Sequence, residues 1–264
     1  MKQGDFPMKV TFSFIGTGNM GGALARAACK QLNPDEILLT NRTAAKAHSL
    51  AQELGCLSGT TADAAQNGRY IFLGVKPQMM AGLLTEIAPI LAQRTDRFTL
   101  VTMAAGLTMQ QISSMAGGDY PVIRIMPNTP CAVGAGVVLY DSNSLVTAQE
   151  VSEFTTAMSG AGVLDHLEEH LIDAGSAVAG CGPAFACLFL EGLADGGVTC
   201  GLPRAKALLY AAQMLEGTAR LMMESGQHPG AMKDAVCSPG GSKIAGVRAL
   251  EEHGERLILQ RLLS

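Results

Sequence analysis

The chain has 264 residues, of which 48% are hydrophobic and 16% are charged, and its formal net charge at pH 7 is -4. This length and composition predict a globular protein with one large domain or two modest ones. The weak negative charge, without a cluster of lysines and arginines, argues against nucleic acid as the main partner and favours a small molecule.

The cysteines and the termini indicate the compartment. Seven cysteines are scattered without a C-x-x-C pair, which predicts reduced thiols in a cytoplasmic protein and no metal site. Residues 1–7 lack the apolar core of a signal peptide and are interpreted as a disordered or expression-derived lead-in. The longest uncharged run, 174–190, is interrupted by glycines and by Pro183, so we expect a buried core segment rather than a membrane span.

A glycine-rich turn follows the first predicted strand, residues 9–15, and precedes a helix-favouring stretch, 23–32. Strand, G-x-G-x-x-G and helix in this order form the dinucleotide-binding fingerprint, although the same glycines could serve a merely structural turn. The turn therefore predicts a cofactor site made by Ile15, Gly16, Thr17, Gly18, Asn19, Met20 and Gly21.

The end of the second predicted strand, 36–40, bears on the choice of cofactor. An NAD-binding protein places an acidic residue here for the ribose 2'-hydroxyl, whereas this chain has Asn41-Arg42-Thr43. Because a guanidinium can bind a 2'-phosphate through charge-assisted hydrogen bonds, the segment favours NADPH and leaves NADH possible. The alternative is that Arg42 is an ordinary surface residue.

Strands and helices continue to alternate, which predicts a mostly parallel sheet with helices on both faces. The further strands are 70–75, 98–102, 122–126, 137–140 and 162–164, and the helices are 44–54, 78–91, 109–115 and 148–158. Ligands bind at the carboxyl edge of such sheets, where Val75-Lys76-Pro77 and Ala104-Ala105 are expected to contact the cofactor. The alternative for Lys76 is a surface lysine beside a proline that starts a helix. We assign residues 8–164 to a Rossmann-like domain.

Residues 165–264 are predicted to form a separate helical domain, with helices at 168–178, 183–200 and 204–225. The last of these is apolar on nearly every side. Such a helix must be buried all round, which about 100 residues can hardly achieve, so we expect a homodimer formed through this domain.

A turn near the chain end resembles an anion site. Pro239 and two glycines precede a helix that Ser242 is expected to cap. Backbone N–H groups at the helix start, the Ser238 hydroxyl and the Lys243 ammonium could converge on a carboxylate or phosphate. An ordinary turn between two helices is the alternative. The predicted substrate-binding residues are Ser238, Gly240, Gly241, Ser242 and Lys243.

Short motifs occur in a fixed order along the chain. They are Phe14-Ile15-Gly16-Thr17-Gly18-Asn19-Met20-Gly21, Val75-Lys76-Pro77, Ala104-Ala105-Gly106, Met126-Pro127-Asn128-Thr129-Pro130, Gly182-Pro183-Ala184-Phe185, Ala194-Asp195-Gly196-Gly197-Val198, Gly201-Leu202-Pro203-Arg204, His228-Pro229-Gly230 and Ser238-Pro239-Gly240-Gly241. Taken together, they resemble the pyrroline-5-carboxylate reductases over nearly the whole chain.

The resemblance implies a Rossmann domain followed by a helical domain that interlocks with its partner, in dimers that sometimes form larger rings. It implies reduction of the cyclic imine 1-pyrroline-5-carboxylate to L-proline with NAD(P)H. It also places Glu169 near the ring nitrogen and the 238–243 turn on the substrate carboxylate, so Glu169 and Lys243 are the expected catalytic residues.

The sequence departs from the family pattern in two places. Cys181 stands where members usually have serine, and Lys243 stands where they usually have a threonine whose hydroxyl contacts the imine nitrogen. Lys243 could swing away, serve as a donor for a different cyclic imine or anionic substrate, or mark a homologue that binds NADPH without catalysis. A β-hydroxyacid dehydrogenase is a further alternative, but its catalytic lysine is absent from Gly182-Pro183-Ala184-Phe185.

Overall fold

We analysed a computed structural model, which describes residues 10–254. The predicted lead-in, 1–7, lies outside the described residues. By contacts the chain forms two compact units, one up to Cys181 and one from Gly182, which are described separately below.

The N-terminal unit is built on one eight-stranded sheet in the order β3-β2-β1-β4-β5-β6-β7-β8. Neighbouring strands are parallel except β6 and β7, which are antiparallel. The strands are β1 (Val10–Ile15), β2 (Ile37–Thr40), β3 (Leu57–Ser58), β4 (Gly68–Leu73), β5 (Thr99–Thr102), β6 (Val122–Pro127), β7 (Gly136–Ser142) and β8 (Gly162–His166). The predicted mostly parallel sheet is therefore confirmed.

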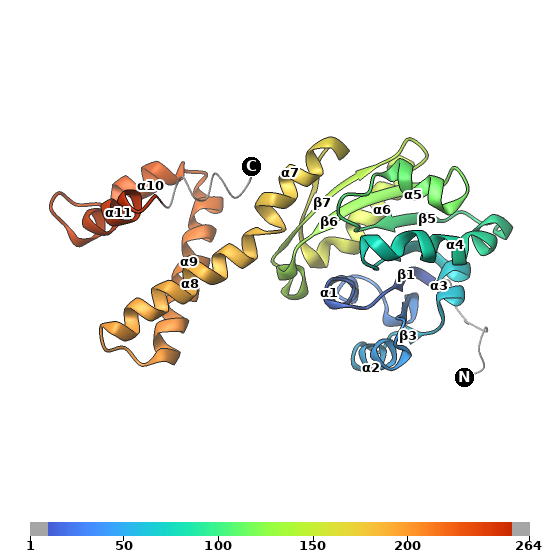
Figure 1. Cartoon of the computed structure of the whole chain (residues 1–264), viewed down its shortest axis with the longest axis horizontal. Helices are drawn as coiled ribbons and strands as arrows, with labels where there is room; N and C mark the ends of the chain where they lie inside the picture. The colour runs from blue at the N-terminus through green and yellow to red at the C-terminus, as the bar shows by residue number, and fades with distance from the viewer. Residues whose placement is uncertain (1–9, 255–264) are drawn as a thin grey trace. The chain divides into compact units, whose positions relative to one another are not determined.

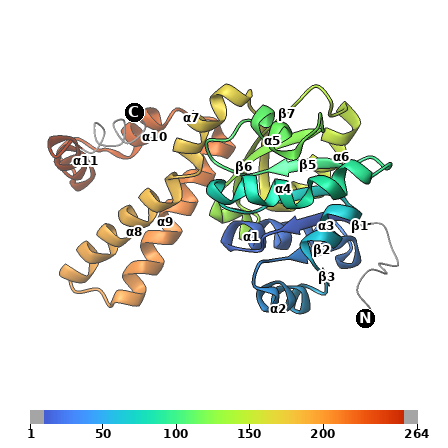
Figure 2. The same ribbon diagram turned by 45° about the vertical axis from the view of Figure 1, so that its right-hand side comes forward.

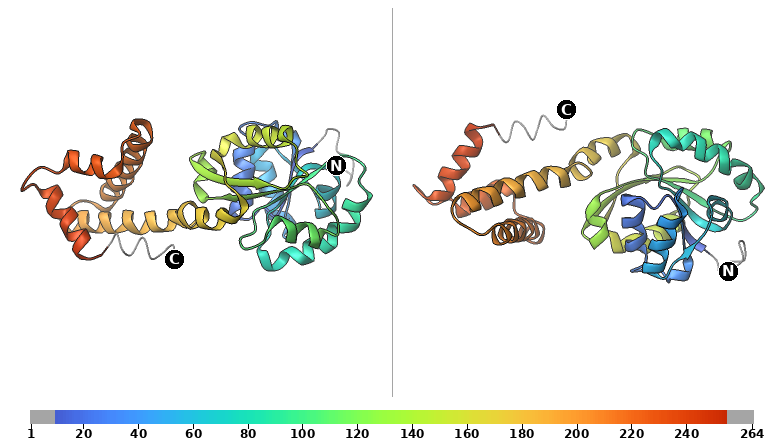
Figure 3. Two further views of the ribbon diagram at one scale, coloured as in Figure 1. Left: turned by 90° about the horizontal axis from the view of Figure 1, so that it is seen from above. Right: turned by 60° about the horizontal axis from the view of Figure 1, so that its bottom comes forward.

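Helices cover both faces of this sheet (Figures 1 and 3). One layer contains α1 (Asn19–Ala28), α2 (Ala44–Leu54) and α6 (Ala148–Met158), and the other contains α3 (Thr61–Asn67), α4 (Pro77–Gln93) and α5 (Met109–Ala116). α7 (Glu169–Ala179) packs on β6 and β7. Short 3-10 helices lie at Pro34–Glu36, Thr129–Val133 and Ser159–Ala161.

The apolar alternation of the strands fills both layers. On the α1 side, Phe14 stacks on Phe72 with ring centroids 4.3 Å apart, and Phe12 and Phe154 lie against the same cluster. On the opposite side, α3, α4 and α5 bury aliphatic side chains against the strands. Burial of this kind is the main stabilising contribution to such a domain, and it holds the strand ends in fixed register.

The C-terminal unit is helical in its described part, with α8 (Gly182–Thr199), α9 (Arg204–Ser225), α10 (Pro229–Val236) and α11 (Ser242–Glu252). α8 and α9 lie side by side and contact each other through small residues, with Ala194 and Ala207 buried (Figure 2). The outer faces are apolar and exposed in the single chain. Their large residues are Leu188, Phe189, Leu193, Leu208, Leu209, Tyr210, Met214, Leu221, Met222 and Met223.

The expectation of a buried core segment at 174–190 is wrong for the single chain. The helical run Glu169–Thr199 has a mean hydropathy of 1.6, and only 6% of its most apolar window is buried. By length and composition alone this run could cross a membrane. One such helix is only weak evidence of a membrane span, because core helices of soluble proteins pass the same test. Its small and aliphatic residues instead form the exposed helical surfaces described above.

Besides the short 3-10 helices, the sequence analysis did not predict β3, α3 and α10. α3 is short and polar, but Thr60 and Asp63 form a capping box at its start, and that pair was a readable signal. α1 begins at Asn19, four residues earlier than predicted, because the glycine-rich turn leads directly into the helix. α9 has the predicted bounds, 204–225, and Pro203 is its N-cap.

Candidate cofactor site and substrate loop

The predicted cofactor residues meet at one edge of the sheet. β2, β1, β4 and β5 are adjacent and parallel, and Ile15 is in register with both Thr40 and Leu73. The carboxyl ends of the strands therefore bring together the glycine-rich turn, the Asn41–Thr43 segment, the Gly74–Pro77 segment and the turn after β5. This is the edge at which doubly wound sheets bind nucleotides.

Each of the three fingerprint glycines lacks a side chain for a different steric reason. Gly16 has φ +108°, and a Cβ there would lie 2.4 Å from the Gly74 carbonyl oxygen. A Cβ on Gly21 would lie 2.1 Å from the Gly16 oxygen, so α1 can approach the turn only without that carbon. A Cβ on Gly18 would meet nothing within 4 Å. The absence of a side chain at Gly18 therefore keeps open a space that the described protein atoms do not fill.

The start of α1 is suited to an anion. Gly18 is its N-cap, and no side chain accepts a hydrogen bond from the first turn. The first N–H groups of a helix have no partner within the helix, and the helix dipole favours negative charge there. The Thr17 hydroxyl beside this turn is buried without a hydrogen-bond partner among the described residues. Free amides, an unpartnered hydroxyl and an open Gly18 fit a dinucleotide pyrophosphate.

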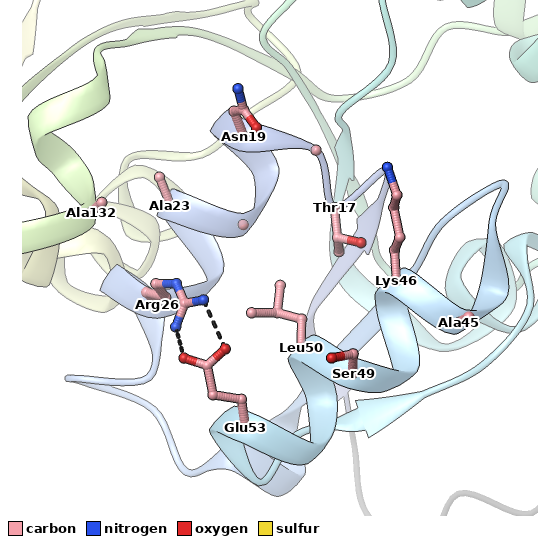
Figure 4. Close-up of a pocket in the computed structure, with 12 residues that line it drawn as sticks. Thr17, Asn19, Ala23, Arg26, Ala45, Lys46, Ser49, Leu50, Glu53 and Ala132 are labelled. Atoms are coloured by element: carbon pink, nitrogen blue, oxygen red, sulfur yellow. Dashed lines mark hydrogen bonds and ion pairs between the residues drawn. The ribbon is translucent and has the colours of Figure 1, made fainter.

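A pocket of about 580 Å³ runs from this turn between α1 and α2 (Figure 4). Thr17 and Asn19 lie at one end, and Arg26 pairs with Glu53 at the other. One Arg26–Glu53 hydrogen bond is 2.9 Å long, and the guanidinium lowers the pKa of the Glu53 carboxyl below its usual value. Lys46 on α2 extends toward the Thr17 end and was missed by the sequence analysis. Its position one turn after Thr43 was the available signal.

The other predicted cofactor residues differ in how exposed their side chains are to solvent. Arg42 and Lys76 are exposed, and Lys76 precedes Pro77, the first residue of α4. Ala104 is buried in the core below the sheet edge, so it can offer a ligand only its backbone, whereas Ala105 is exposed.

Glu169 is the first residue of α7 and is not among the residues that line the pocket beside the glycine-rich turn. Its carboxylate accepts a hydrogen bond from the Met109 amide at 2.7 Å and lies 3.6 Å from the buried Arg124 guanidinium. Arg124 also pairs with Asp173 at 2.6 Å, one turn further along α7. The Glu169 side chain remains 27% exposed and borders a second pocket, of about 430 Å³. Its carboxylate is thus held in place and still accessible.

The predicted substrate loop is a turn between α10 and α11. Gly241 N–H donates to the Ser238 carbonyl at 3.0 Å, with Pro239 and Gly240 at the two central positions and φ +69° at Gly240. Proline followed by a left-handed glycine is the pattern of a type II turn. The turn leads directly into α11 (Ser242–Glu252), whose N-cap is Gly241.

The prediction that Ser242 caps α11 is wrong. Gly241 is the N-cap, Ser242 is the first helical residue, and no side chain caps the first turn. The hydroxyl lies one position too late for the geometry of a cap. The first amides of α11 are therefore left open, and Lys243 beside them has no ion pair within residues 10–254.

Comparison with known proteins matches both units. Residues 169–264 match the family model for pyrroline-5-carboxylate reductase dimerisation, and residues 11–106 match the model for NADP oxidoreductase, coenzyme F420-dependent. The pyrroline-5-carboxylate reductase of Escherichia coli (strain K12) is 38% identical over 252 residues, covering 94% of this chain and 93% of that protein. The chain belongs to the pyrroline-5-carboxylate reductase family.

Solved structures of reductases of this family agree with the fold. The 1-pyrroline-5-carboxylate reductase from Streptococcus pyogenes has a TM-score of 0.85 at 29% identity, covering 96% of this chain and 95% of that one. The pyrroline carboxylate reductase of Plasmodium falciparum, solved with NADP bound, has a TM-score of 0.84 at 26% identity, covering 97% and 95%. An NADP-binding α/β domain followed by a helical dimerisation domain is thus confirmed.

Family membership also confirms the predicted activity. The protein is a pyrroline-5-carboxylate reductase, which converts 1-pyrroline-5-carboxylate to proline with NADPH. Its dimerisation domain makes it an oligomer and accounts for the exposed apolar faces of α8 and α9. The β-hydroxyacid dehydrogenase alternative is set aside by the same match.

Proposed function

We propose that this chain performs the family's reaction with two helix starts that bind anions, one for each reactant. α1 and α11 both have glycine as the N-cap and no capping side chain. Uncapped amides at the positive end of a helix favour a bound anion. This shared construction is the observation that carries the proposal: α1 binds the cofactor pyrophosphate and α11 binds the substrate carboxylate.

The cofactor would be held along the carboxyl edge of the N-terminal sheet, and bound NADPH would supply the hydride. The glycine-rich turn from Ile15 to Gly21 cradles the pyrophosphate, with the Thr17 hydroxyl as an additional donor. Asn41, Arg42 and Thr43 face the adenosine ribose. The segments Val75-Lys76-Pro77 and Ala104-Ala105 line the side on which the nicotinamide lies.

Arg42 is proposed to select NADPH over NADH. It is exposed after β2, where its guanidinium can bind the 2'-phosphate. Removing charge-assisted hydrogen bonds worth about 1.5–3 kcal/mol should raise the KM for NADPH roughly 10- to 150-fold in Arg42→Ala. The KM for NADH should stay within about twofold, since NADH lacks that phosphate. An equal rise with both cofactors would contradict the assignment.

The turn from Ser238 to Lys243 is proposed to hold the substrate carboxylate through the open amides of α11 and the Ser238 hydroxyl. Lys243 adds positive charge beside the carboxylate, but a cation near the ring disfavours the protonated imine. Threonine would remove that charge and provide a hydroxyl for the ring nitrogen. Lys243→Thr is therefore expected to preserve or raise kcat/KM for the five-membered imine.

Arg248→Thr is the matched control, because it removes a positive charge from the same helix about one turn further on, where Arg248 pairs with Glu252. It should leave kcat/KM unchanged. If Lys243→Thr loses more than about tenfold while the control does not, Lys243 is a working catalytic group. The cofactor assignment above would be unaffected by that outcome.

Glu169 is proposed as the anion that favours the protonated imine. Its carboxylate is fixed by the Met109 amide and by Arg124, yet it keeps an exposed part. Glu169→Gln should move the alkaline limb of the kcat/KM profile to lower pH, because a neutral amide no longer stabilises the iminium. Asp173→Asn removes the other carboxylate that pairs with Arg124 and leaves the Glu169–Met109 hydrogen bond intact. It should leave the pH profile of kcat/KM unchanged. A shift in both variants would indicate a purely structural role.

We also propose that the protein is a homodimer that can assemble into a larger ring. We further propose that it is cytoplasmic and that nucleic acids and membranes are not among its partners. Membership of a soluble enzyme family, the dimerisation domain and the acidic net charge support them. The cysteine pattern supports a reducing compartment. We also propose that the functional boundary between the domains follows 8–164 and 165–264.

A further inference from the structure

Two cysteines far apart in sequence meet beside the cofactor pocket. Cys29 is the C-cap of α1, and Cys56 follows α2 and the turn at Gly55. Their sulfur atoms are 3.4 Å apart across 27 residues of chain, and both residues are half-buried. Within residues 10–254, no other two cysteine sulfurs lie within hydrogen-bond contact. Neither cysteine lines the cofactor pocket or belongs to the proposed substrate loop.

From this geometry we infer that Cys29 and Cys56 form a reversible thiol–disulfide site, which reacts with small disulfides such as oxidised glutathione. A disulfide needs an S–S distance of about 2.05 Å, so the sulfurs must approach by roughly 1.4 Å. Gly55, with φ +75°, lies next to Cys56 in the turn and lets that side adjust. The bond would join the C-terminal ends of α1 and α2, just beyond the Arg26–Glu53 pair that closes the pocket.

The surroundings distinguish the two sulfurs. The two sulfur atoms are in hydrogen-bond contact, and this contact, together with the Arg26 charge one turn earlier, lowers the pKa of Cys29. The same contact and burial raise the pKa of Cys56. Thiolates are the nucleophiles in disulfide exchange, and a positive charge favours the thiolate. Arg26 acts on Cys29, whereas the charged neighbour of Cys56 besides Cys29 is Asp35, so we assign Cys29 as the attacking thiol and Cys56 as the resolving one.

The exchange balances without any other reactant. The Cys29 thiolate attacks one sulfur of glutathione disulfide, breaks that S–S bond and releases one glutathione thiolate. Cys56 gives up its proton to a glutathione thiolate and attacks the Cys29 sulfur of the mixed disulfide, releasing the second glutathione. Two protein thiols are oxidised, and one glutathione disulfide is reduced to two glutathione molecules. Such a bond in a reducing compartment would be transient and responsive to redox state.

The test is disulfide mapping of the reduced full-length protein after incubation with glutathione disulfide. Free thiols are blocked with N-ethylmaleimide, and the digest is analysed by mass spectrometry with and without reductant. We expect a Cys29–Cys56 linked peptide two hydrogens lighter than the sum of its parts, which disappears with dithiothreitol. It should form at least tenfold faster than any disulfide involving the exposed Cys181, and it should form equally in Cys181→Ser.

Cys29→Ser and Cys56→Ser should each abolish the linked peptide. In Cys56→Ser, the mixed glutathione adduct should accumulate on Cys29, because the resolving thiol is absent. A second reading is thermal: the oxidised wild type should melt several degrees above the reduced form, since the bond restrains the unfolded chain. Continued labelling of both cysteines by N-ethylmaleimide, pairing with other cysteines, or a lower melting temperature on oxidation would overturn the inference.

Discussion

At the residue scale, the glycines of the glycine-rich turn serve two different purposes, packing within the protein and space for the cofactor. Gly16 and Gly21 are required by contacts within the protein, because a Cβ at either position would overlap a backbone oxygen. Gly18 has open space around it and ordinary backbone angles, φ -70° and ψ -165°. Of the three fingerprint glycines, only Gly18 is not required by contacts within the protein. A substitution at Gly18 therefore tests cofactor binding without disturbing the fold.

This difference predicts opposite outcomes for two matched variants. Gly21→Ala should lower the free energy of unfolding by about 1–3 kcal/mol, because the added carbon overpacks α1 against the Gly16 oxygen. Gly18→Ala should leave unfolding within about 0.5 kcal/mol of wild type yet weaken NADPH binding tenfold or more. Urea denaturation and NADPH titration of both variants check this. Unchanged NADPH affinity in Gly18→Ala would show that the open space is not the cofactor cradle.

At the element scale, sequence patterns predicted those strands and helices that carry a strong apolar period. β1, β2, β4, β5 and β6 were predicted because each is a run of buried residues. α3 and β3 are too short or too polar to show that period, and they form because neighbouring strands provide the pairing and packing. The meeting of four loops at one edge of the sheet could also be inferred from the sequence, because parallel strands end at the same edge.

The site was less predictable where tertiary contacts decide it. The fingerprint and the turn at Pro239-Gly240 were readable from residue types, since each depends on local backbone angles. The partners of Glu169 were not, because the Met109 amide and Arg124 belong to other elements. The same holds for Lys46 and for the meeting of Cys29 with Cys56, which depend on how α1 and α2 pack.

The start of α6 contains a buried ion pair with a predictable pH response. The Glu150 carboxylate is 4% exposed and accepts hydrogen bonds from Arg97 Nε at 2.8 Å, Arg69 at 3.0 Å and the Thr147 amide at 2.9 Å. Arg97, first, and then Thr147 lower its pKa from 4.5 to about 2, against the opposing effect of burial. A lowered pKa stabilises the fold above the unfolded-state pKa, and this stabilisation is lost as the pH falls toward 2.

Glu150→Gln should therefore lower the free energy of unfolding by about 3 kcal/mol at pH 7 and by less than half as much at pH 3. Glutamine can still accept the capping hydrogen bond from Thr147, so the change isolates the charge. Urea denaturation at both pH values measures it, with the more exposed Glu153→Gln as the control, expected to change stability by less than about 0.5 kcal/mol. An equal loss at pH 7 and pH 3 would contradict the ionic explanation.

At the scale of the whole molecule, the apolar surfaces of α8 and α9 make sense only in an assembly. Leu209 and Met223 are 61% and 70% exposed in the single chain. Burying one such side chain contributes about 1.5–3 kcal/mol, and several together suffice for a stable dimer. The dimerisation family model matches residues 169–264, a range that includes both helices.

Leu209→Glu should therefore weaken self-association by at least 100-fold, because a carboxylate would have to be buried at the interface. Light scattering coupled to size-exclusion chromatography would show a smaller species at micromolar concentration. Leu145→Glu, at an exposed leucine of the N-terminal unit, is the matched control and should keep the wild-type mass. A wild-type mass for both variants would place the interface elsewhere.

The central claim is that this chain reduces the five-membered imine with NADPH. The most direct measurement is a steady-state assay of NADPH oxidation with 1-pyrroline-5-carboxylate, run beside its six-membered homologue and with NADH as the cofactor control. We predict robust turnover of the five-membered imine and a higher kcat/KM with NADPH than with NADH. Intact NADPH binding without turnover of that imine would contradict the account and make Lys243 the mark of a different substrate or of a lost activity.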